Sequence, residues 1–258
     1  MIKIATYNVN SLRRRISIVM DWLKAEKPDV LALQETKVSD EEFPKEAFTK
    51  DGWNVIFKGQ KGHHGVALVS KKPLTNIQTY LYEAPEAEAR FIKGDYEGLP
   101  IFNTYIPQGY EITSPKYKVK LKFFADLKKY FSKHLKPDQP ALWVGDLNVA
   151  QTEIDLARPA ANRDHVCFHI DARKALADVM EGMWVDLFRD KEKGPGHYTF
   201  WSMRYGGATF KNNVGWRVDL ILGTRPMVSR LKKIWIDKAP RSLKDSSDHT
   251  FVAAEFSE

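Results

Sequence analysis

Asp146 and Asn148 follow the apolar run ALWV in the stretch WVGDLNVA, where a strand would end. Residues two apart in an extended chain project to the same side, ~6.6 Å apart at ~3.3 Å per residue. If the chain stays extended past Gly145, the two side chains point together. The acid could then take a proton or a metal ion, and the amide could donate N–H to an oxyanion. In isolation, the motif is also compatible with a turn in which both side chains bond to the local backbone.

Five other apolar runs also carry polar groups at one end. The groups are Asn8, Gln34 with Glu35, Tyr105, Asp219, and Asp248 with His249. Each one alone is compatible with a cap or a turn, although an unpaired acid such as Glu35 would be costly to bury. Side chains that project from one edge of a sheet converge on a crevice, where α/β folds bind ligands. Together the six endings predict one polar site.

The residue types in this set favour a hard cation. They are carboxylates, amides and a histidine without a thiol ligand, which argues against zinc of the Cys/His type. Glu35 is the best candidate for the metal carboxylate, and Mg²⁺ or Mn²⁺ is the expected ion. Two other clusters lack the second half of a zinc motif, and we interpret both as structural: His63 with His64, and His165 with Cys167 and His169.

His249 needs an acid to orient its imidazole. Asp248 is its neighbour in sequence, and adjacent residues on a strand face opposite ways. The orienting acid must therefore come from elsewhere, and Asp219 is our candidate. No Gly-X-Ser-X-Gly motif accompanies the histidine, which argues against a serine triad.

Short apolar runs with β character recur along the chain between helical patterns, which indicates an α/β fold. One amphipathic helix should include Ile16, Val19, Met20 and Leu23 and end before Pro28. A segment rich in Gly, aromatics and cations, residues 191–213, predicts a long functional loop.

A longer helix should begin with Ser114 as N-cap and Pro115 at its first position, and should stop before Pro137. We place five lysines on its outer face and interpret them as a solvated surface rather than a DNA-docking stripe. They are Lys116, Lys120, Lys122, Lys129 and Lys133.

Composition narrows the partners and the compartment. The 258 residues carry a formal charge of +7, from 40 Lys and Arg against 33 Asp and Glu, which favours a polyanionic partner. The one cysteine fits a reducing cytoplasm, and the N-terminus lacks the pattern of a secretory signal. No apolar run approaches the ~18 residues of a membrane span. We expect one domain over residues 1–258 that acts as a monomer, because no linker, repeat or exposed apolar stripe is evident.

Seven motifs resemble, in order from Thr6 to His249, those of the exonuclease III family of abasic-site endonucleases. They are TYNVNSLR, DVLALQETK, YIPQG, WVGDLNVA, IDLARP, GWRVDLIL and SDH. The resemblance implies a four-layered α/β sandwich, with two β-sheets packed face to face and helices outside, whereas periodicity alone favours a doubly wound sheet. It also implies a Mg²⁺- or Mn²⁺-dependent enzyme that cleaves duplex DNA 5′ to abasic sites and often acts at 3′ ends.

The resemblance implies roles in metal binding for three strand-end residues. Glu35 would be the principal ligand, with Asn8 beside it and Asp248 on the metal side. A two-metal arrangement would recruit further ligands. These would be Asp146, Asn148 and His249.

It also implies catalytic roles for five residues. Asp146 would handle the proton of the attacking water or the leaving group, and Asn148 would hold the water and the developing charge. Tyr105 would contact the scissile phosphate. His249, oriented by Asp219, would bind a phosphate oxygen.

The DNA-binding residues implied by the resemblance are aromatic and basic. Phe200 and Trp216 would wall a pocket for a flipped-out, base-less sugar, with Trp201 nearby. Four basic residues are expected in loops that face the phosphate backbone. They are Arg13, Arg14, Arg15 and Lys61.

Two other functions stay open. One is a phosphatase of the same superfamily that acts on phosphoinositides or other phosphoesters, and the other is a catalytically inactive DNA-binding module. The positive charge and the aromatic loop favour DNA over a soluble head group. The complete set of polar strand ends argues against an inactive protein.

Overall fold

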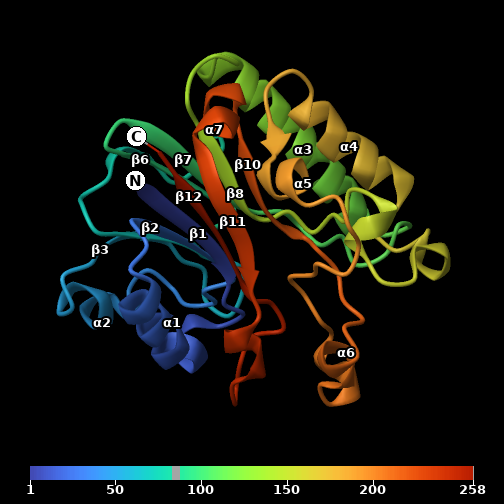
Figure 1. The fold of residues 1–258 in the computed structure, drawn as a ribbon, viewed down its shortest axis with the longest axis horizontal. Coiled ribbons are helices and arrows are strands. Elements are labelled where there is room, and N and C mark those ends of the chain that lie inside the picture. The colour runs from blue at the N-terminus through green and yellow to red at the C-terminus, as the bar shows by residue number, and fades with distance from the viewer. Residues whose placement is uncertain (83–87, 258) are drawn as a thin grey trace.

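Two six-stranded β-sheets pack face to face in the computed structural model, which describes residues 1–82 and 88–257, and helices cover the outer faces (Figure 1). This is the four-layered sandwich that the resemblance implies. The doubly wound sheet that periodicity favours is wrong, because the strands divide between two sheets.

Each sheet contains one parallel pair of neighbouring strands, and its other neighbours are antiparallel. The first sheet, in the order β11–β12–β1–β2–β4–β3, consists of β1 (Ile2–Asn8), β2 (Val30–Gln34), β3 (Asn54–Lys58), β4 (Val66–Ser70), β11 (Leu231–Asp237) and β12 (Phe251–Phe256). The second, in the order β5–β6–β7–β8–β10–β9, consists of β5 (Thr75–Gln78), β6 (Phe91–Tyr96), β7 (Leu99–Tyr105), β8 (Leu142–Asp146), β9 (Val185–Asp186) and β10 (Asp219–Gly223).

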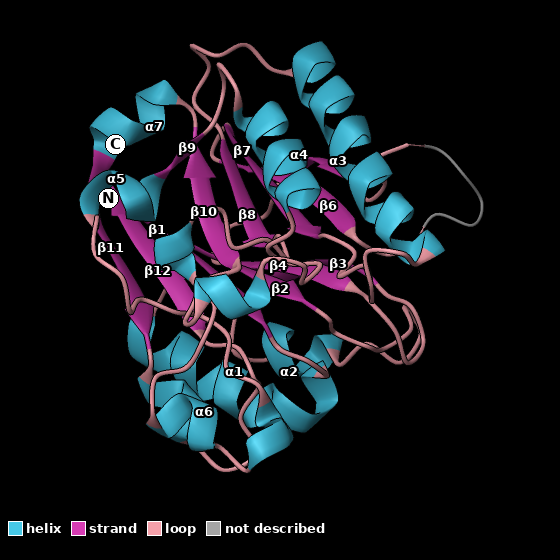
Figure 2. Ribbon diagram, turned by 90° about the vertical axis from the view of Figure 1, so that its right-hand side faces the viewer, coloured by secondary structure: helices cyan, strands magenta, loops and turns pink. Residues whose placement is uncertain are grey.

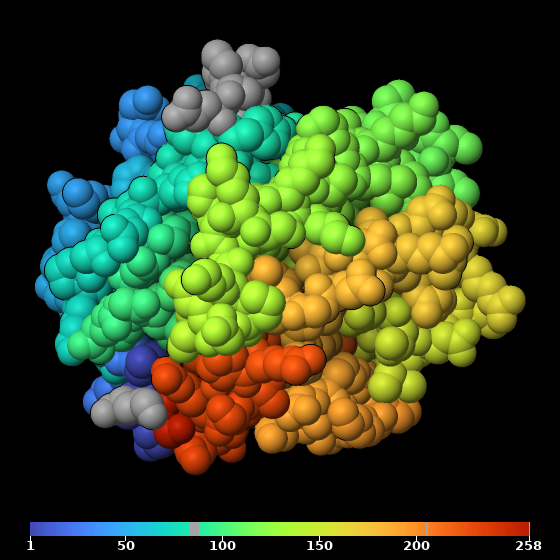
Figure 3. Space-filling model, turned by 90° about the horizontal axis from the view of Figure 1, so that it is seen from above, coloured from blue at the N-terminus to red at the C-terminus, as the bar shows by residue number. Residues whose placement is uncertain are grey.

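The α-helices lie outside the sheets, with α1 on the first sheet and α3 beside α4 on the second (Figure 2). In the space-filling view, α3 (green) and α4 (gold) lie side by side on the surface (Figure 3). In the described residues they are α1 (Leu12–Glu26), α2 (Lys45–Thr49), α3 (Pro115–His134), α4 (Ile170–Met180), α5 (Leu187–Lys191), α6 (Ala208–Lys211) and α7 (Arg225–Arg230). None of the helices in residues 1–82 and 88–257 combines the length and the hydropathy needed to cross a membrane.

The central strands bury both of their faces. In β2, Val30 and Ala32 point into the core between the sheets, while Leu31 and Leu33 pack in the core that includes α1. A strand covered on both sides has no polar face, so its sequence is a continuous apolar run instead of an alternation. This is why periodicity cannot distinguish a sandwich from a single doubly wound sheet.

The long helix is confirmed. Ser114 caps α3 by accepting a hydrogen bond from the backbone N–H of Lys116 at 3.2 Å, and Pro115 follows it in the first turn. The helix ends at His134, before Pro137. The earlier amphipathic helix is confirmed as α1, which ends before Pro28 with Lys27 in the left-handed conformation.

The placement of Lys120 on the solvated face of α3 is wrong, since its side chain is fully buried. Tyr117, Lys120, Phe124 and Leu127 are spaced three or four residues apart and share the face that packs on the second sheet. A lysine at this position can bury its apolar stem with its neighbours, provided that its ammonium finds partners.

The expectation that residues 13–15 lie in a loop is also wrong. Arg13, Arg14 and Arg15 lie in the first turns of α1, and Arg15 is buried. The guanidinium of Arg15 donates to the backbone oxygens of Asn10, Asp245 and Ser246, which ties α1 to the segment before β12. The predicted loop over residues 191–213 contains a short 3₁₀ turn, Met203–Tyr205, and α6.

The strand register brings the polar strand ends to one edge of the sandwich. Asn8 is paired with Gln34 in the parallel pair β1 and β2, and Tyr105 with Asp146 in the parallel pair β7 and β8. Asp219 begins β10 opposite Asp146.

Candidate active site

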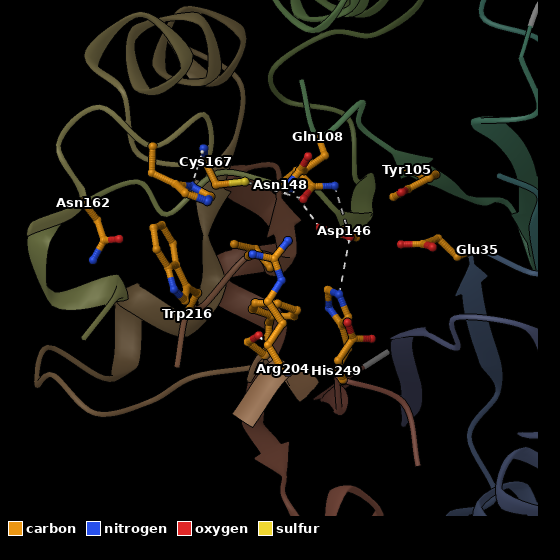
Figure 4. A pocket seen from close by; sticks show the side chains of 15 residues that line it. Glu35, Tyr105, Gln108, Asp146, Asn148, Asn162, Cys167, Arg204, Trp216 and His249 are labelled. Atoms are coloured by element: carbon orange, nitrogen blue, oxygen red, sulfur yellow. Dashed lines mark hydrogen bonds and ion pairs between the residues drawn. The ribbon is translucent and has the colours of Figure 1, made fainter. Parts of the chain in front are cut away.

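A cavity of about 570 Å³ lies at this edge, and most of the predicted site residues line it (Figure 4). Those that do are Glu35, Tyr105, Asp146, Asn148, Phe200, Trp216, Asp248 and His249. Asn8 and Asp219 are buried behind the lining and hydrogen-bond to it. Both sheets therefore contribute to one polar site, as the strand ends predict.

Three residues offer ligand atoms for a cation. One atom each of Glu35, Asp146 and His249 lies within 4.8 Å of the other two. Two carboxylates beside an imidazole suit a divalent ion such as Mg²⁺ or Mn²⁺. Burial opposes ionisation of Glu35, but Lys37, 2.8 Å from Oε2, and the amide of Asn8 outweigh it and lower the pKa of Glu35. The donor set and its charge therefore fit a metal ion.

Asn8 turns its amide nitrogen, and not its oxygen, towards the carboxylates. Nδ2 donates to Glu35 Oε1 and to Asp146 Oδ2, each at 2.8 Å. Oδ1 accepts from the backbone N–H of Asn10 at 3.0 Å, which fixes the orientation of the amide. In this orientation Asn8 holds the two carboxylates together instead of ligating a cation, contrary to the expectation.

Asp146 is a buried acid with a raised pKa. Burial raises the pKa of Asp146 to about 7, Asp219 and Glu35 contribute in the same direction, and His249 and Asn8 oppose them. A carboxylate that exchanges a proton near neutral pH is suited to act as a general base or acid.

His249 pairs with the acid that the sequence argument selects. Its Nδ1 lies 2.8 Å from Asp219 Oδ2. Its Nε2 lies 3.9 Å from Asp146 Oδ2, and Figure 4 shows this second contact. Burial alone would lower the pKa of His249, but Asp219, followed by Asp146 and Asp248, outweighs it and raises the pKa to about 10. The imidazole is therefore a cation at neutral pH, with Nδ1 donating to Asp219.

The chain at WVGDLNVA does not stay extended past Gly145, and the turn considered for this motif is the geometry that brings Asp146 and Asn148 together. Asp146 Oδ1 accepts from the backbone N–H of Asn148 at 2.9 Å, as in a turn, and Asn148 Nδ2 lies 3.3 Å from Asp146 Oδ2. Asn148 has a left-handed φ of 49°, which asparagine tolerates better than most residues. Glycine is required at position 145, because the φ of Gly145 is 134° and a Cβ there would lie 2.0 Å from the backbone oxygen of Thr104.

Tyr105 lies beside the carboxylates and keeps its proton. Burial, then Glu35 and Asp146, raise its pKa well above the usual value. The guanidinium of Arg90 lies 4.7 Å from the centre of its ring. The phenol is therefore a neutral hydrogen-bond donor in the cavity, and Glu35 is its partner in this structure.

Asp248 lines the cavity outside the group of three ligand atoms. Its Oδ1 accepts from Asn10 Nδ2 at 2.9 Å and from the hydroxyl of Ser247 at 3.3 Å. Burial opposes ionisation, but His249 and Asn10 outweigh it and lower the pKa of Asp248. Asp248 therefore adds negative charge near His249, and the geometry does not favour it as a ligand.

Aromatic side chains also line the cavity, and Trp216 lies across it from Glu35 (Figure 4). Phe200 and Trp216 both line the cavity, and the ring centre of Phe200 lies 4.9 Å from that of His249. The ring centre of His165 lies 4.7 Å from that of Trp216. Trp201 does not belong to this wall, because its side chain is completely buried and contacts Phe210 edge-on. The expectation that Trp201 contacts DNA is therefore not supported.

A buried ion-pair network fixes the segment that carries Trp216. Arg217 Nε donates to Asp155 Oδ1 and its NH2 group to Asp186 Oδ2, both at 2.7 Å, and Arg189 also contacts Asp155 at 2.8 Å. Asp155 comes from the IDLARP motif and Arg217 from GWRVDLIL, so two separate motifs meet behind the aromatic wall.

We expect Asp155→Asn to lower the free energy of unfolding by about 3–5 kcal/mol, because it leaves two buried guanidinium groups without their shared acid. The two arginines hold the pKa of Asp155 below 3.8 against burial, so its contribution is present above that pH and is lost as the pH falls through the lowered value. Urea unfolding at pH 7 and at pH 3 measures both effects. Glu42→Gln, which breaks the exposed pair with Arg13, should change stability by less than about 1 kcal/mol.

Of the four basic residues expected at the DNA backbone, Arg13, Arg14 and Lys61 are exposed, and Arg15 is buried. The side chain of Arg13 is 57% exposed, and Lys61 is exposed in the turn between β3 and β4. Their contact with DNA stays a prediction.

Sequence reasoning missed several residues that line the cavity. They are Gln108, Asn162, His165, Cys167, Ser202 and Arg204. Gln108 follows Tyr105 in YIPQG, so its proximity to a strand end was a usable signal. The sequence predicts a structural role for the cluster of His165, Cys167 and His169, yet His165 and Cys167 line the cavity.

The chain belongs to the Endonuclease/Exonuclease/phosphatase family, whose model matches residues 5–249. It is 34% identical over 253 residues to a DNA-(apurinic or apyrimidinic site) endonuclease of Dictyostelium discoideum, covering 96% of this chain and 68% of that protein. It is 31% identical to exodeoxyribonuclease III of Haemophilus influenzae, covering 98% of this chain and 99% of that protein.

Solved structures agree with this assignment. An AP endonuclease from Archaeoglobus fulgidus superposes with a TM-score of 0.97 at 40% identity, over 100% of both chains. A 3′ phosphatase, NExo from Neisseria, solved with a product DNA hairpin, superposes with a TM-score of 0.94 at 30% identity, also over 100% of both chains. The relatives of this chain are therefore nucleases and a phosphatase that act on DNA.

Proposed function

We propose that this protein is a divalent-metal-dependent DNA phosphodiesterase that cleaves duplex DNA on the 5′ side of abasic sites and also acts at 3′ ends. The observation that carries the proposal is the meeting of Glu35, Asp146 and His249 in a cavity that Phe200 and Trp216 also line. Hydrolysis of a phosphodiester needs the carboxylates and the imidazole, and a pocket for a base-less sugar needs the aromatic side chains. The proposed enzyme is one catalytic domain over residues 1–258 that works as a monomer in the cytoplasm.

The cation site would consist of Glu35 and Asp146. A bound Mg²⁺ or Mn²⁺ would supply positive charge to the scissile phosphate. His249 could join as a ligand only in its neutral form, which its raised pKa disfavours at neutral pH. Asn8 would keep the two carboxylates in place through its two hydrogen bonds.

The remaining chemistry falls to the protein's own side chains. Asp146 accepts a proton from the attacking water, while Asn148 Nδ2 holds the water or the developing charge beside it. The imidazolium of His249 and the phenol of Tyr105 donate hydrogen bonds to phosphate oxygens as negative charge develops. Asp219 keeps the imidazole protonated on Nδ1 and aims Nε2 into the cavity.

Duplex DNA is the substrate that the surface supports best. The formal charge of +7 favours a polyanion, and Arg13 and Lys61 offer exposed cations. Phe200 and Trp216 offer flat apolar surface at the cavity, which a soluble phosphorylated head group would not use.

A labelled duplex with one abasic site tests the proposal. Incubation with Mg²⁺ should give a single nick 5′ to the lesion, and excess chelator should abolish it. The same duplex without the lesion, with a recessed 3′ end, measures the exonuclease activity. Metal-dependent hydrolysis of phosphoinositides alone would favour the superfamily phosphatase, and tight binding without any cleavage would favour the inactive module. Either result would reject the proposal.

We expect Trp216→Ala to raise KM for the abasic duplex about 10-fold, since an aromatic contact to an extruded nucleotide contributes ~1–3 kcal/mol. Degradation from a recessed 3′ end should change less. Steady-state kinetics on the two duplexes measures the difference. An equal loss on both substrates would show that the wall supports the fold and does not recognise the lesion.

A further inference from the structure

Lys120 is a buried cation directly behind the candidate active site. It lies in the second turn of α3 and is fully buried. Its Nζ donates to three backbone oxygens, those of Gln108 at 3.1 Å, Asn148 at 2.7 Å and Val166 at 2.8 Å. An ammonium group has three N–H donors, so all of them are used.

The three oxygens belong to three different segments of the cavity wall. Gln108 follows β7, Asn148 follows β8, and Val166 lies in the turn before α4. Each segment carries a side chain that lines the cavity, namely Gln108, Asn148 and Cys167. One ammonium therefore connects three segments that are separated by up to 58 residues. The backbone bond from Ala150 N–H to the oxygen of Cys167, at 2.8 Å, joins two of these segments as well.

No ion pair joins Lys120 to an acid within residues 1–82 and 88–257, and the hydrogen bonds of its ammonium all go to backbone oxygens. Burial lowers its pKa, and the nearby Cys167 and Asp146 oppose this. A methionine could fill the same space without the cost of burying a cation, which is several kcal/mol per ion. What the ammonium adds over an apolar side chain is the fixed direction of three carbonyl groups.

The bond to Asn148 has the most direct chemical consequence. The residue adopts the left-handed conformation, and its Nδ2 reaches both Asp146 and the backbone oxygen of Ile106. Its Oδ1 lies 3.7 Å from the Sγ of Cys167, in the segment that Lys120 also holds. If the oxygen of Asn148 lost its partner, the peptide could rotate and carry the amide away from Asp146.

We propose that Lys120 is a positioning residue, which sets the amide of Asn148 against Asp146 by clamping the segments around Gln108, Asn148 and Val166. The kinetic consequence rests on the proposed function, whereas the clamp itself does not. A displacement of about 1 Å by a change outside the reacting groups can cost ~10²-fold in rate. The clamp should therefore affect kcat more than DNA binding.

Lys120→Met tests the proposal, with Lys118→Met on the exposed face of the same helix as its control. We expect Lys120→Met to lower kcat on the abasic duplex about 30- to 100-fold with KM changed less than about 3-fold. Lys118→Met should match the wild type in kcat. A kcat of Lys120→Met within about 3-fold of the wild type would overturn the proposal.

Amide hydrogen exchange gives a second readout that needs neither DNA nor metal. In Lys120→Met, residues 106–110, 147–150 and 165–168 should exchange faster, while β1 and β2 stay protected. Faster exchange over the whole chain would indicate loss of stability only and would overturn the proposal. If the wild type fails to nick abasic DNA, the proposed function fails, and the exchange pattern still decides the role of Lys120.

Chemical rescue separates the charge from the packing. Lys120→Ala leaves room for a small amine, and propylamine should restore kcat and the protection of the three segments in a concentration-dependent way. Propanol has the same apolar length without the cation and should not. Equal rescue by both would overturn the proposal. If the methionine variant fails to fold, Lys120→Ala refolded in propylamine provides the same comparison.

Discussion

Asp146→Asn should lose about 10²–10⁴-fold in kcat for the abasic duplex and keep its DNA affinity. The substitution removes the group that exchanges a proton in the cavity while preserving its shape. Burial and Asp219 raise the pKa of Asp146 to about 7, so removing its charge offsets part of the stability that is lost where the new amide nitrogen faces the N–H donors of Asn8 and Asn148. The acidic limb of wild-type kcat/KM should lie at or below pH 7, since a bound cation can only lower this pKa.

Single-turnover cleavage, a DNA-binding titration and thermal unfolding together test this expectation. Asp178→Asn, a matched change at an exposed acid of α4, should leave all three unchanged. If Asp146→Asn cleaved within 10-fold of the wild type, Asp146 would not be the proton acceptor. If it also lost DNA binding, its role would be in shaping the cavity.

His249→Gln should lower kcat by about 10²–10³-fold, because it removes a cationic donor aimed at the phosphate. Asp219→Asn should cost less on its own, and the double variant should be no worse than His249→Gln. The two residues act as a unit through the 2.8 Å contact between Nδ1 and Oδ2, so their effects should not add. A double-mutant cycle of kcat/KM measures the coupling, and strictly additive losses would contradict it.

The pH profile of Asp219→Asn provides an independent check. Asp219 is the strongest of the influences that raise the pKa of His249 to about 10, against the opposing effect of burial. Without it the imidazole should lose its proton at lower pH, and the alkaline limb of kcat/KM should move towards neutrality. An unshifted alkaline limb would mean that another group controls it.

The strand ends were the most informative part of the sequence. Asn8, Tyr105, Asp146, Asp219 and His249 each follow or precede an apolar run, and the register of the sheets then forces them to one edge. Such positions can be predicted because a polar group beside a buried strand must be either paired or exposed to a cavity or solvent. Strand alternation excludes Asp248 as the acid that orients His249, and the structure places the chosen candidate, Asp219, 2.8 Å from Nδ1.

Periodicity does not predict the sandwich, because strands that are buried on both faces lack the alternation of apolar and polar residues. Side-chain partners were equally hidden. The sequence predicts an exposed Lys120, whereas the structure places three backbone oxygens from distant segments around its ammonium group. Arg15 and Trp201 are further examples. Arg15 is buried against the segment before β12 and Trp201 against α6, and no local sequence pattern predicts either contact.

The orientation of Asn8 also depends on contacts that sequence does not show. A side-chain amide can offer its oxygen to a cation or its nitrogen to an anion. The backbone N–H of Asn10 decides between the two by occupying Oδ1.

The position of Mn²⁺ in crystals of the protein, located by anomalous scattering, tests the central claim most directly. The account predicts a peak within coordination distance of both Glu35 and Asp146, next to His249, and its absence in Glu35→Gln. Ions bound only elsewhere, with the carboxylates of Glu35 and Asp146 free of metal at saturating Mn²⁺, would contradict it.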